Sequence, residues 1–277
     1  MKLRLLTFDI EEWFLYEQYP KGGKGYFLPI INNLLDELLD ILDSHNHKAT
    51  FFCLGIIARE YPDIIKKIAL RGHEIGCHSD RHLRVNEMTP EEFENDLQIA
   101  KKSLESVINS KITSYRAPAF SIGSKNLWAF DILARNGIQI DCSIFPATRS
   151  EVGYNNFKHA GPVIIRTIYG ELLELPLNIY NFRGFKVPYS GGGYFRLLPY
   201  SVIKTMTEKS DYVMAYFHLR DFDSKQKVYI SWRYFKSYYG IKKMLPKLKR
   251  FLSDYEFMPV GAAFEKLQKG TFKKIEF

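Results

Sequence analysis

The clearest signal in this chain is the segment Glu74-Ile75-Gly76-Cys77-His78-Ser79-Asp80-Arg81-His82. It places two histidines, His78 and His82, four residues apart directly after a short apolar run. Residues i and i+4 share one face of a helical turn, so both imidazoles could reach one metal ion. Such a pair alone is more often a surface coincidence than a metal site, and a catalytic metal needs another protein ligand and a position open to water. Any further ligand must therefore come from elsewhere in the chain.

Short apolar segments alternate with helical patterns through the first half of the chain. Thr89-Pro90-Glu91-Glu92 is a capping box with proline in the first turn, which marks the start of one helix. The patterns predict strands over 3–9, 48–54, 73–77, 112–115 and 138–140, separated by helices over 28–42, 56–70, 89–108 and 124–137. This alternation favours a parallel α/β sheet or barrel, and in such barrels active sites lie at the carboxyl ends of the strands.

Polar residues follow the predicted strands where such a site would form. They are, in chain order, Asp9, Glu11, His78, His82, Arg116, Asp141 and His218, the last after an apolar strand over 212–217. Asp9 and Glu11 point to the same side of an extended segment, so one carboxylate could join the histidines on a metal while the other acts as a base. Arg116 would favour the ionised form of that base, and His218 could protonate a leaving group. Taken alone, Asp9 and Arg116 are better explained as a plain buried ion pair.

The middle of the chain departs from the alternation. Segments 163–167 and 171–175 flank Ile168-Tyr169-Gly170 and predict a β-hairpin. Three glycines in Ser190-Gly191-Gly192-Gly193-Tyr194-Phe195-Arg196 predict a loop that passes close to another part of the molecule. No Gly-Lys-Ser/Thr follows the glycines, which excludes a phosphate-binding P-loop. We find no internal repeat and no domain boundary, and we expect a single domain over residues 1–277.

The composition is that of a globular protein with a substantial core. Hydrophobic residues make up 46% and aromatic residues 15% of the 277 residues, and aromatic rings often line sugar sites as well as cores. The net charge of +8 suits an anionic partner, but no aromatic–basic motif for nucleic acid is present. No window reaches 18 uninterrupted apolar residues, so we expect no membrane span, while a peripheral contact with a membrane surface stays open.

The three cysteines, Cys53, Cys77 and Cys142, lie in or beside apolar strands. Their small, odd number argues against a disulfide framework and for buried free thiols in a reducing compartment. The amino terminus runs directly into Asp9 and Glu11 without the apolar region of a secretory signal. We therefore expect a cytoplasmic protein.

Five motifs, in this order, resemble those of the polysaccharide deacetylases of the NodB-homology group, the family-four carbohydrate esterases. They are Thr7-Phe8-Asp9-Ile10-Glu11, His78-Ser79-Asp80-Arg81-His82, Arg116-Ala117-Pro118-Ala119-Phe120, Asp141-Cys142-Ser143-Ile144-Phe145-Pro146 and Tyr216-Phe217-His218. The run from Gly191 to Tyr200 resembles a subgroup associated with bacterial exopolysaccharide and capsule gene clusters. The ordered set covers most of the chain and is far more specific than any single motif.

The resemblance implies a deformed (β/α) barrel, often seven-stranded and here with a β-hairpin insertion, that hydrolyses an N-acetyl group from an amino sugar with the help of a metal. Matched motif by motif, it implies that Asp9 is the base and that Arg116 orients it. It further implies that His218 is the general acid and that Asp141 tunes His218. The implied ligands of a divalent ion, with zinc as the expected metal, are Glu11, His78 and His82. The backbone amide near Phe120 would help to hold the oxyanion. The residues expected to contact substrate are Pro118, Phe120, Tyr194, Phe195 and Arg196.

Two departures from the family pattern affect these expectations. The usual first motif has two adjacent aspartates, whereas Ile10 separates Asp9 from Glu11, so Glu11 is the expected ligand and Glu12 is the alternative. The fifth motif continues as Leu219-Arg220-Asp221, where the subgroup often has proline and tryptophan. The charge of Arg220 on the substrate side points to an acidic glycan.

The leading interpretation is a metal-dependent N-deacetylase that acts on an amino-sugar glycan or a lipid-linked sugar during surface-polysaccharide synthesis. The same site chemistry also suits amide hydrolysis on a small non-sugar molecule. A third interpretation is a catalytically silent glycan-binding protein on the same fold, which predicts that an acid, a base or a ligand is missing, yet all are present here. A nucleic-acid partner is the poorest fit.

Overall fold

A computed structural model describes residues 2–11, 24–147, 153–154, 156–224, 239–267 and 272–277. Glu12, the alternative metal ligand, lies outside the described residues. Cys53, Cys77 and Cys142 are buried free thiols, as predicted. No helix in the described part of the chain is long and apolar enough to cross a membrane.

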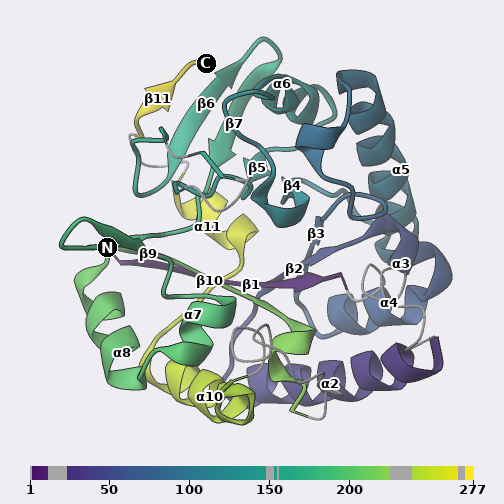
Figure 1. Ribbon diagram of the computed structural model, residues 1–277. Helices are drawn as coiled ribbons and strands as arrows, with labels where there is room; N and C mark the ends of the chain where they lie inside the picture. The colour runs from purple at the N-terminus through teal and green to yellow at the C-terminus, as the bar shows by residue number, and fades with distance from the viewer. Residues whose placement is uncertain (1, 12–23, 148–152, 155, 225–238, 268–271) are drawn as a thin grey trace.

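One sheet connects the two halves of the chain (Figure 1). Its nine strands, in spatial order, are β10 (Tyr212–His218), β1 (Leu3–Ile10), β2 (Thr50–Cys53), β3 (Glu74–Cys77), β4 (Ser114–Tyr115), β5 (Ile140–Asp141), β7 (Gly170–Glu174), β6 (Val163–Thr167) and β11 (Lys274–Ile275). The seven strands from β10 to β7 are parallel, and β6 and β7 form the predicted antiparallel hairpin. A second sheet pairs β8 (Tyr180–Phe182) with β9 (Phe185–Val187). The predicted parallel α/β fold is confirmed.

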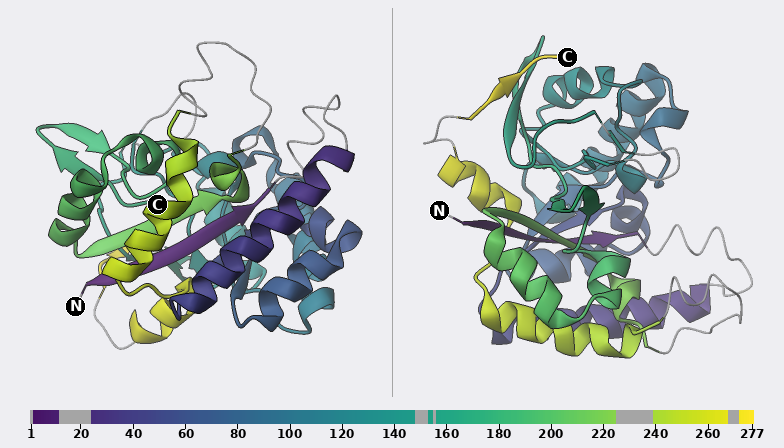
Figure 2. Two further views of the ribbon diagram at one scale, coloured as in Figure 1. Left: turned by 90° about the horizontal axis from the view of Figure 1, so that it is seen from below. Right: turned by 60° about the vertical axis from the view of Figure 1, so that its left-hand side comes forward.

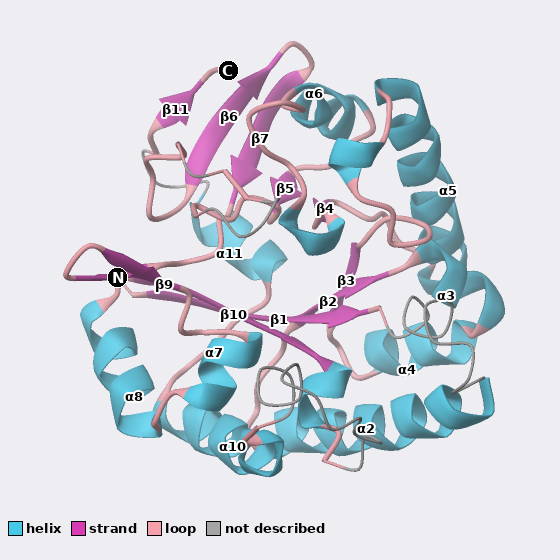
Figure 3. Cartoon of the chain, in the orientation of Figure 1, coloured by secondary structure: helices cyan, strands magenta, loops and turns pink. Residues whose placement is uncertain are grey.

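Helices lie along the outer side of the arc that the strands form (Figures 1 and 3). They are α2 (Lys24–Ser44), α3 (Gly55–Glu60), α4 (Pro62–Leu70), α5 (Pro90–Ile108), α6 (Trp128–Arg135), α7 (Gly192–Leu197), α8 (Tyr200–Lys209) and α10 (Met244–Asp254), whereas α11 (Val260–Leu267) lies on the inner side of the arc. The 3₁₀ turns are η1 (Val85–Glu87), η2 (Pro118–Phe120), η3 (Leu219–Phe222) and η4 (Ile241–Lys243). The capping box of α5 forms as predicted, because Thr89 accepts the N–H of Glu92 and Glu92 accepts the N–H of Thr89. The helix expected over 56–70 is instead two helices, since Tyr61 precedes Pro62 and a residue before proline avoids the helical conformation.

Alternate residues of β1 face two different cores. Leu6 and Phe8 pack in the larger core, which includes buried side chains of the surrounding helices. Leu3 and Leu5 pack with residues of α11 in a second core, and Figure 2 shows α11 near the start of β1 in its right-hand view. Since side chains alternate along a strand, Asp9 lies on the same inner face as Leu3 and Leu5. This inner face is the one that positions polar residues at the carboxyl end of the strand.

Side chains join the two ends of the parallel run, β7 and β10. Asn178 Oδ1 accepts the N–H of Met214 at 2.9 Å, and the Tyr212 hydroxyl donates at 2.7 Å to a main-chain carbonyl just after β7. On the same side of β10 a single bridge pairs Gly191 with Tyr216. A Cβ on Gly191 would lie 2.1 Å from the Tyr216 ring, so the glycine-rich segment does pass close to another element, although α7 already begins at Gly192. Among the described residues no strand ladder links β7 to β10, so the barrel is a deformed one.

Candidate metal centre and active site

Glu11, His78 and His82 bring three potential ligand atoms within 4.8 Å of one another. Glu11 Oε2 lies 2.8 Å from His82 Nε2 and 3.5 Å from His78 Nε2. Glu11 follows β1 and both histidines follow β3, so the carboxyl ends of two strands bring the three residues together. All three side chains are buried, and imidazole and carboxylate are common zinc ligands. The cluster expected from the sequence is therefore assembled.

The two histidines meet through a tight loop rather than a helical turn. Ser79 and His82 have φ angles of 71° and 63°, and the Ser79 hydroxyl accepts the N–H of His82 at 2.8 Å. Asp96 on α5 accepts the N–H of Asp80 at 3.0 Å. Arg59 on α3 donates to both carboxylate oxygens of Asp80, at 2.6 and 2.8 Å. The expectation that the histidines share a helical face is therefore wrong, because side chains from two helices hold the segment in another conformation.

His78 presents one ring nitrogen to the position where an ion would lie. Its Nδ1 is 2.8 Å from the carbonyl oxygen of Arg116, which can only accept, so Nδ1 carries the hydrogen. Its Nε2 is buried without a hydrogen-bond partner and faces the Glu11 carboxylate. Burial lowers the pKa of His82, which favours the neutral imidazole that metal binding requires. The ring nitrogens of His78 and His82 and the carboxylate of Glu11 thus turn lone pairs toward one another in a buried cluster. A cation between them would remove their mutual repulsion, so the residues present suit a divalent metal.

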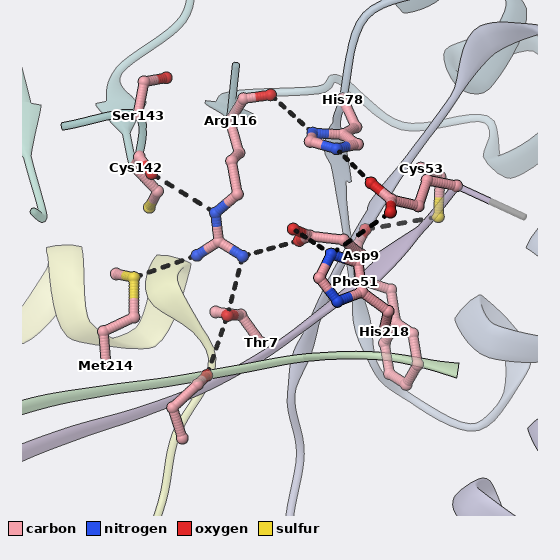
Figure 4. A network of polar contacts seen from close by, with 12 residues as sticks. Thr7, Asp9, Phe51, Cys53, His78, Arg116, Cys142, Ser143, Met214 and His218 are labelled. Atoms are coloured by element: carbon pink, nitrogen blue, oxygen red, sulfur yellow. Dashed lines mark hydrogen bonds and ion pairs between the residues drawn. The ribbon is translucent and has the colours of Figure 1, made fainter. Parts of the chain in front are cut away.

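Arg116 lies fully buried beside Asp9, the expected base (Figure 4). Its Nη1 donates to Asp9 Oδ1 at 2.7 Å and to the Thr7 hydroxyl at 3.0 Å. Its Nε lies 3.4 Å from the carbonyl oxygen of Cys142, and its Nη2 lies 3.0 Å from the sulfur of Met214. Although burial opposes the charge, Asp9 helps to raise the pKa of Arg116. These contacts fix the Asp9 carboxylate on the inner face, next to the candidate metal ligands.

His218 reaches the same carboxylates from the neighbouring strand β10. Its Nε2 lies 3.4 Å from Glu11 Oε1 and 4.0 Å from Asp9 Oδ2. Its Nδ1 lies 3.2 Å from Asp221 Oδ2. Although burial lowers it, Glu11 and Asp221 raise the pKa of His218 to about 9. An imidazolium held in this position can give a proton to a group that enters the site.

Arg220 places a second cation beside Glu11. Its Nη2 lies 3.0 Å from Glu11 Oε1, and its side chain is 37% exposed whereas that of Glu11 is 5% exposed. Although burial raises it, His218 and Arg220 hold the pKa of Glu11 well below its usual range. Glu11 therefore directs Oε2 to the histidine pair and Oε1 to the two cations.

Asp141, expected to tune His218, has its polar contacts elsewhere. Its carboxylate accepts the hydroxyl of Ser143 at 2.6 Å and the N–H of Ser143 at 3.2 Å. It also forms a buried pair with Glu174, a residue that the sequence analysis did not consider. The carboxylate beside Nδ1 of His218 is that of Asp221, three residues further along the chain. The contacts thus place Asp221 in the position expected of Asp141, and the spacing within η3 is the local signal that could have identified it.

Pro118 and Phe120 form the turn η2 directly after Arg116. The ring of Phe120 packs edge-on against Tyr216 at a centroid distance of 5.2 Å and is partly exposed. The N–H of Phe120 donates to the carbonyl of Ala117 at 3.1 Å. This particular amide is therefore satisfied inside the turn, and the expected oxyanion contact of a backbone amide near Phe120 stays a prediction.

The three expected substrate contacts in the glycine-rich segment differ in exposure. Phe195 is fully buried and packs against Phe217 and Phe251, at centroid distances of 5.0 and 5.2 Å. It belongs to the core, which contradicts its expected contact with substrate. Arg196 is also buried. Of the three, only Tyr194 has an exposed side chain, so it alone keeps a surface for a ligand.

Two family models match consecutive parts of the chain. The model described as polysaccharide deacetylase matches residues 2–139, which include Asp9, Glu11, both histidines of the cluster and Arg116. A model described as a domain of unknown function (DUF3473) matches residues 142–265, which include His218. Strands from both ranges join the same sheet. The expected single domain over 1–277 stays a prediction.

Curated relatives match about a third of the chain. A peptidoglycan-N-acetylglucosamine deacetylase of Bacillus cereus is 42% identical over 84 residues, which are 30% of this chain and 28% of that protein. A chitooligosaccharide deacetylase of Azorhizobium caulinodans is 38% identical over 80 residues, 28% of this chain and 38% of that protein. The matched segments therefore span well under half of these relatives.

The fold has a counterpart among solved structures. The crystal structure of a candidate polysaccharide deacetylase from Mycobacterium smegmatis superimposes with a TM-score of 0.69, covering 99% of this chain and 94% of that one, at 20% identity. This similarity concerns the fold, while the family model covers the residues of the candidate ligand cluster, Glu11, His78 and His82. Residues 2–139 of this chain belong to the polysaccharide deacetylase family, the NodB-homology group of the family-four carbohydrate esterases.

Proposed function

We propose that this protein is a metal-dependent hydrolase that removes N-acetyl groups from amino sugars of a bacterial surface polysaccharide or its precursor. The observation that carries the proposal is the grouping of Glu11, His78 and His82 with Asp9 and His218 close by, all at the carboxyl ends of parallel strands. The names of two curated relatives, a peptidoglycan-N-acetylglucosamine deacetylase and a chitooligosaccharide deacetylase, support the same chemistry.

A divalent ion held by Glu11, His78 and His82, with zinc as our preferred metal, would polarise the acetyl carbonyl and lower the pKa of an attacking water. Asp9, oriented by Arg116, takes a proton from that water as its oxygen attacks the carbonyl carbon. His218 then gives its Nε2 proton to the sugar nitrogen as the C–N bond breaks, while Asp221 holds the ring through Nδ1. The products are acetate and a free amine.

Arg220 supports an acidic glycan as the substrate. Its guanidinium is partly exposed beside the buried carboxylate of Glu11. A bound divalent ion would also neutralise that carboxylate, so the site would carry net positive charge, which attracts a substrate anion. The glycine-rich run before α8 supports a role in exopolysaccharide or capsule synthesis. A lipid-linked precursor handled in the cytoplasm fits this role, and we include that location in the proposal.

The two alternatives are amide hydrolysis on a small non-sugar molecule and silent glycan binding. Tyr194 and Phe120, both with accessible aromatic surface, favour a sugar over a small amide, because aromatic rings commonly pack on sugar faces. The presence of base, acid and three ligand side chains together favours an enzyme over a silent binding protein.

The test is acetate release from N-acetylglucosamine oligomers by the purified protein loaded with zinc. We expect release by the wild type, loss in the presence of a chelator, and loss in Asp9→Asn with metal retained. The matched control is Asp63→Asn, an exposed carboxylate on α4, which should behave as wild type. Oligomer binding without acetate release would support the silent protein, and release only from small amides would support the other alternative.

A further inference from the structure

Asp141 and Glu174 are two acidic side chains enclosed in the protein interior. They are register partners in the parallel pair of β5 and β7, so their side chains leave the sheet on the same face. Both residues have no exposed surface, and burial raises the pKa of both carboxyl groups. Two buried carboxylates side by side on neighbouring strands repel one another strongly, so the pair needs a proton.

The protein donors around the pair show where that proton belongs. Asp141 accepts two hydrogen bonds from Ser143, one from the hydroxyl and one from the main chain. Glu174 Oε1 accepts the N–H of Ile144 at 3.2 Å, and Glu174 Oε2 is buried without a protein donor. The oxygen that lacks a donor is the one that can itself carry hydrogen and donate it to Asp141.

The nearest cation does not remove the need for a proton. The N–H groups of Arg116 are directed to Asp9, Thr7, the carbonyl of Cys142 and the sulfur of Met214. Titratable groups near the pair in the described part of the chain include the Cys142 thiol and the hydroxyls of Tyr115 and Tyr212, and burial raises the pKa of all three, which keeps them neutral.

The pair is connected to the candidate active site through Ser143. Because the Ser143 hydroxyl donates its hydrogen to Asp141, its lone pairs are free to accept the N–H of Ala117 at 2.8 Å. Ala117 follows Arg116 and precedes η2, where Ala119 and Phe120 have φ angles of 54° and 53°. A turn with two left-handed non-glycine residues is strained and needs support from its surroundings.

We propose that Glu174 holds a proton which it donates to Asp141, and that this acid pair is a positioning unit that fixes Ser143, Ala117 and thereby Arg116. The role in catalysis rests on the proposed function, whereas the shared proton does not. The conservative variant Glu174→Gln keeps a donor toward Asp141 and an acceptor toward Ile144, and Glu174→Leu keeps neither.

Infrared spectroscopy at pH 8 tests the proton directly. We expect the wild type to show the carbonyl band of a protonated carboxyl group, and both Glu174 variants to lack it. Glu74→Gln is the control for another buried carboxyl group, which accepts bonds from Thr50, Ser114 and Gly261, and it should keep the band. A wild type without the band, or a Glu174→Gln variant that retains it, would overturn the proposal.

The positioning role is tested by acetate release together with zinc content. We expect Glu174→Gln to keep most of the wild-type rate and Glu174→Leu to lose rate by a factor on the order of 10², the loss typical of misplaced catalytic groups, with zinc retained in both. Equal rates for the leucine and glutamine variants would contradict the role. If no variant, wild type included, releases acetate, the proposed function fails while the infrared result still decides the shared proton. If the leucine variant does not fold, the infrared spectra of Glu174→Gln and the wild type still decide whether Glu174 holds the proton.

Discussion

The carboxylate of Asp221 holds His218 at two points, accepting its backbone N–H at 2.9 Å and lying 3.2 Å from its ring nitrogen Nδ1. Asp221 is fixed in turn because it caps the 3₁₀ turn η3 that begins directly after His218. With Nδ1 directed to Asp221, the hydrogen on Nε2 points toward Glu11 and Asp9. The imidazole is therefore oriented with Nε2 toward the candidate metal cluster, as the proposed proton transfer requires.

Replacing His218 with alanine should slow deacetylation without removing the metal. Loss of a positioned proton donor typically lowers the rate by about 10²–10⁴-fold, and His218 is not a proposed ligand. Acetate release, zinc content and melting temperature are measured on one preparation. A folded, zinc-loaded variant with the wild-type rate would remove His218 from the mechanism.

Removing both histidines of the cluster should abolish metal binding. The double variant His78→Ala/His82→Ala leaves only the Glu11 carboxylate, which cannot hold a divalent ion tightly by itself. Elemental analysis after dialysis should find about one zinc per chain in the wild type and in the control His45→Ala, which lies outside the site. Equal zinc in the double variant would show that the site is elsewhere.

Arg220 should confer a preference for anionic substrates. We expect the ratio of kcat/KM between an oligomer of alternating uronate and N-acetylglucosamine and a neutral oligomer to fall about 10-fold in Arg220→Gln, equivalent to about 1.4 kcal/mol. Arg166→Gln, an exposed arginine on β6, is the control. Should the wild type not distinguish the two oligomers, the acidic-glycan assignment is wrong.

Asp96 should make the protein less stable as the pH rises from 5 to 8. Burial raises the pKa of Asp96 to about 6, above its value in the unfolded chain, so the folded state binds the proton more tightly. The stability from this proton is present at low pH and is lost as the pH rises through about 6, a change of about 1 kcal/mol for one group. Urea unfolding of the wild type and Asp96→Asn at both pH values isolates the effect. Between pH 5 and pH 8 the unfolding free energy of the wild type should fall relative to that of Asp96→Asn. A difference between the two proteins that does not depend on pH would contradict the prediction.

Local patterns in the sequence were sufficient for much of the fold. The capping box at Thr89, the hairpin around Gly170 and the strands that deliver Asp9, His78 and His218 are each encoded within about ten residues. The split at Pro62 also has a local signal, because the residue before a proline avoids the helical conformation. The ligand cluster followed from the rule that the carboxyl ends of parallel strands meet.

What the sequence could not provide depends on contacts between distant segments. The loop between His78 and His82 takes positive φ angles at residues other than glycine, because Arg59 and Asp96 from two different helices bind Asp80. The partner of Asp141 is Glu174, which the hairpin brings into register from 33 positions further along the chain. The burial of Phe195 likewise depends on rings of β10 and α10.

The side-chain junction between β7 and β10 has a consequence for motion. All proposed metal ligands follow β1 and β3 in the interior of the sheet, whereas His218 ends β10, the strand at one edge of the parallel run. On its side toward β7, β10 is held by side-chain hydrogen bonds of Asn178 and Tyr212 and by one bridge at Gly191, without a strand ladder among the described residues. Regions with few backbone hydrogen bonds open at the lowest free energy, so amide hydrogens along this edge should exchange before those of β1 and β2. Under the proposed mechanism, a local opening there would withdraw His218 while Glu11, His78 and His82 keep their places, so activity could be lost and regained without release of the metal.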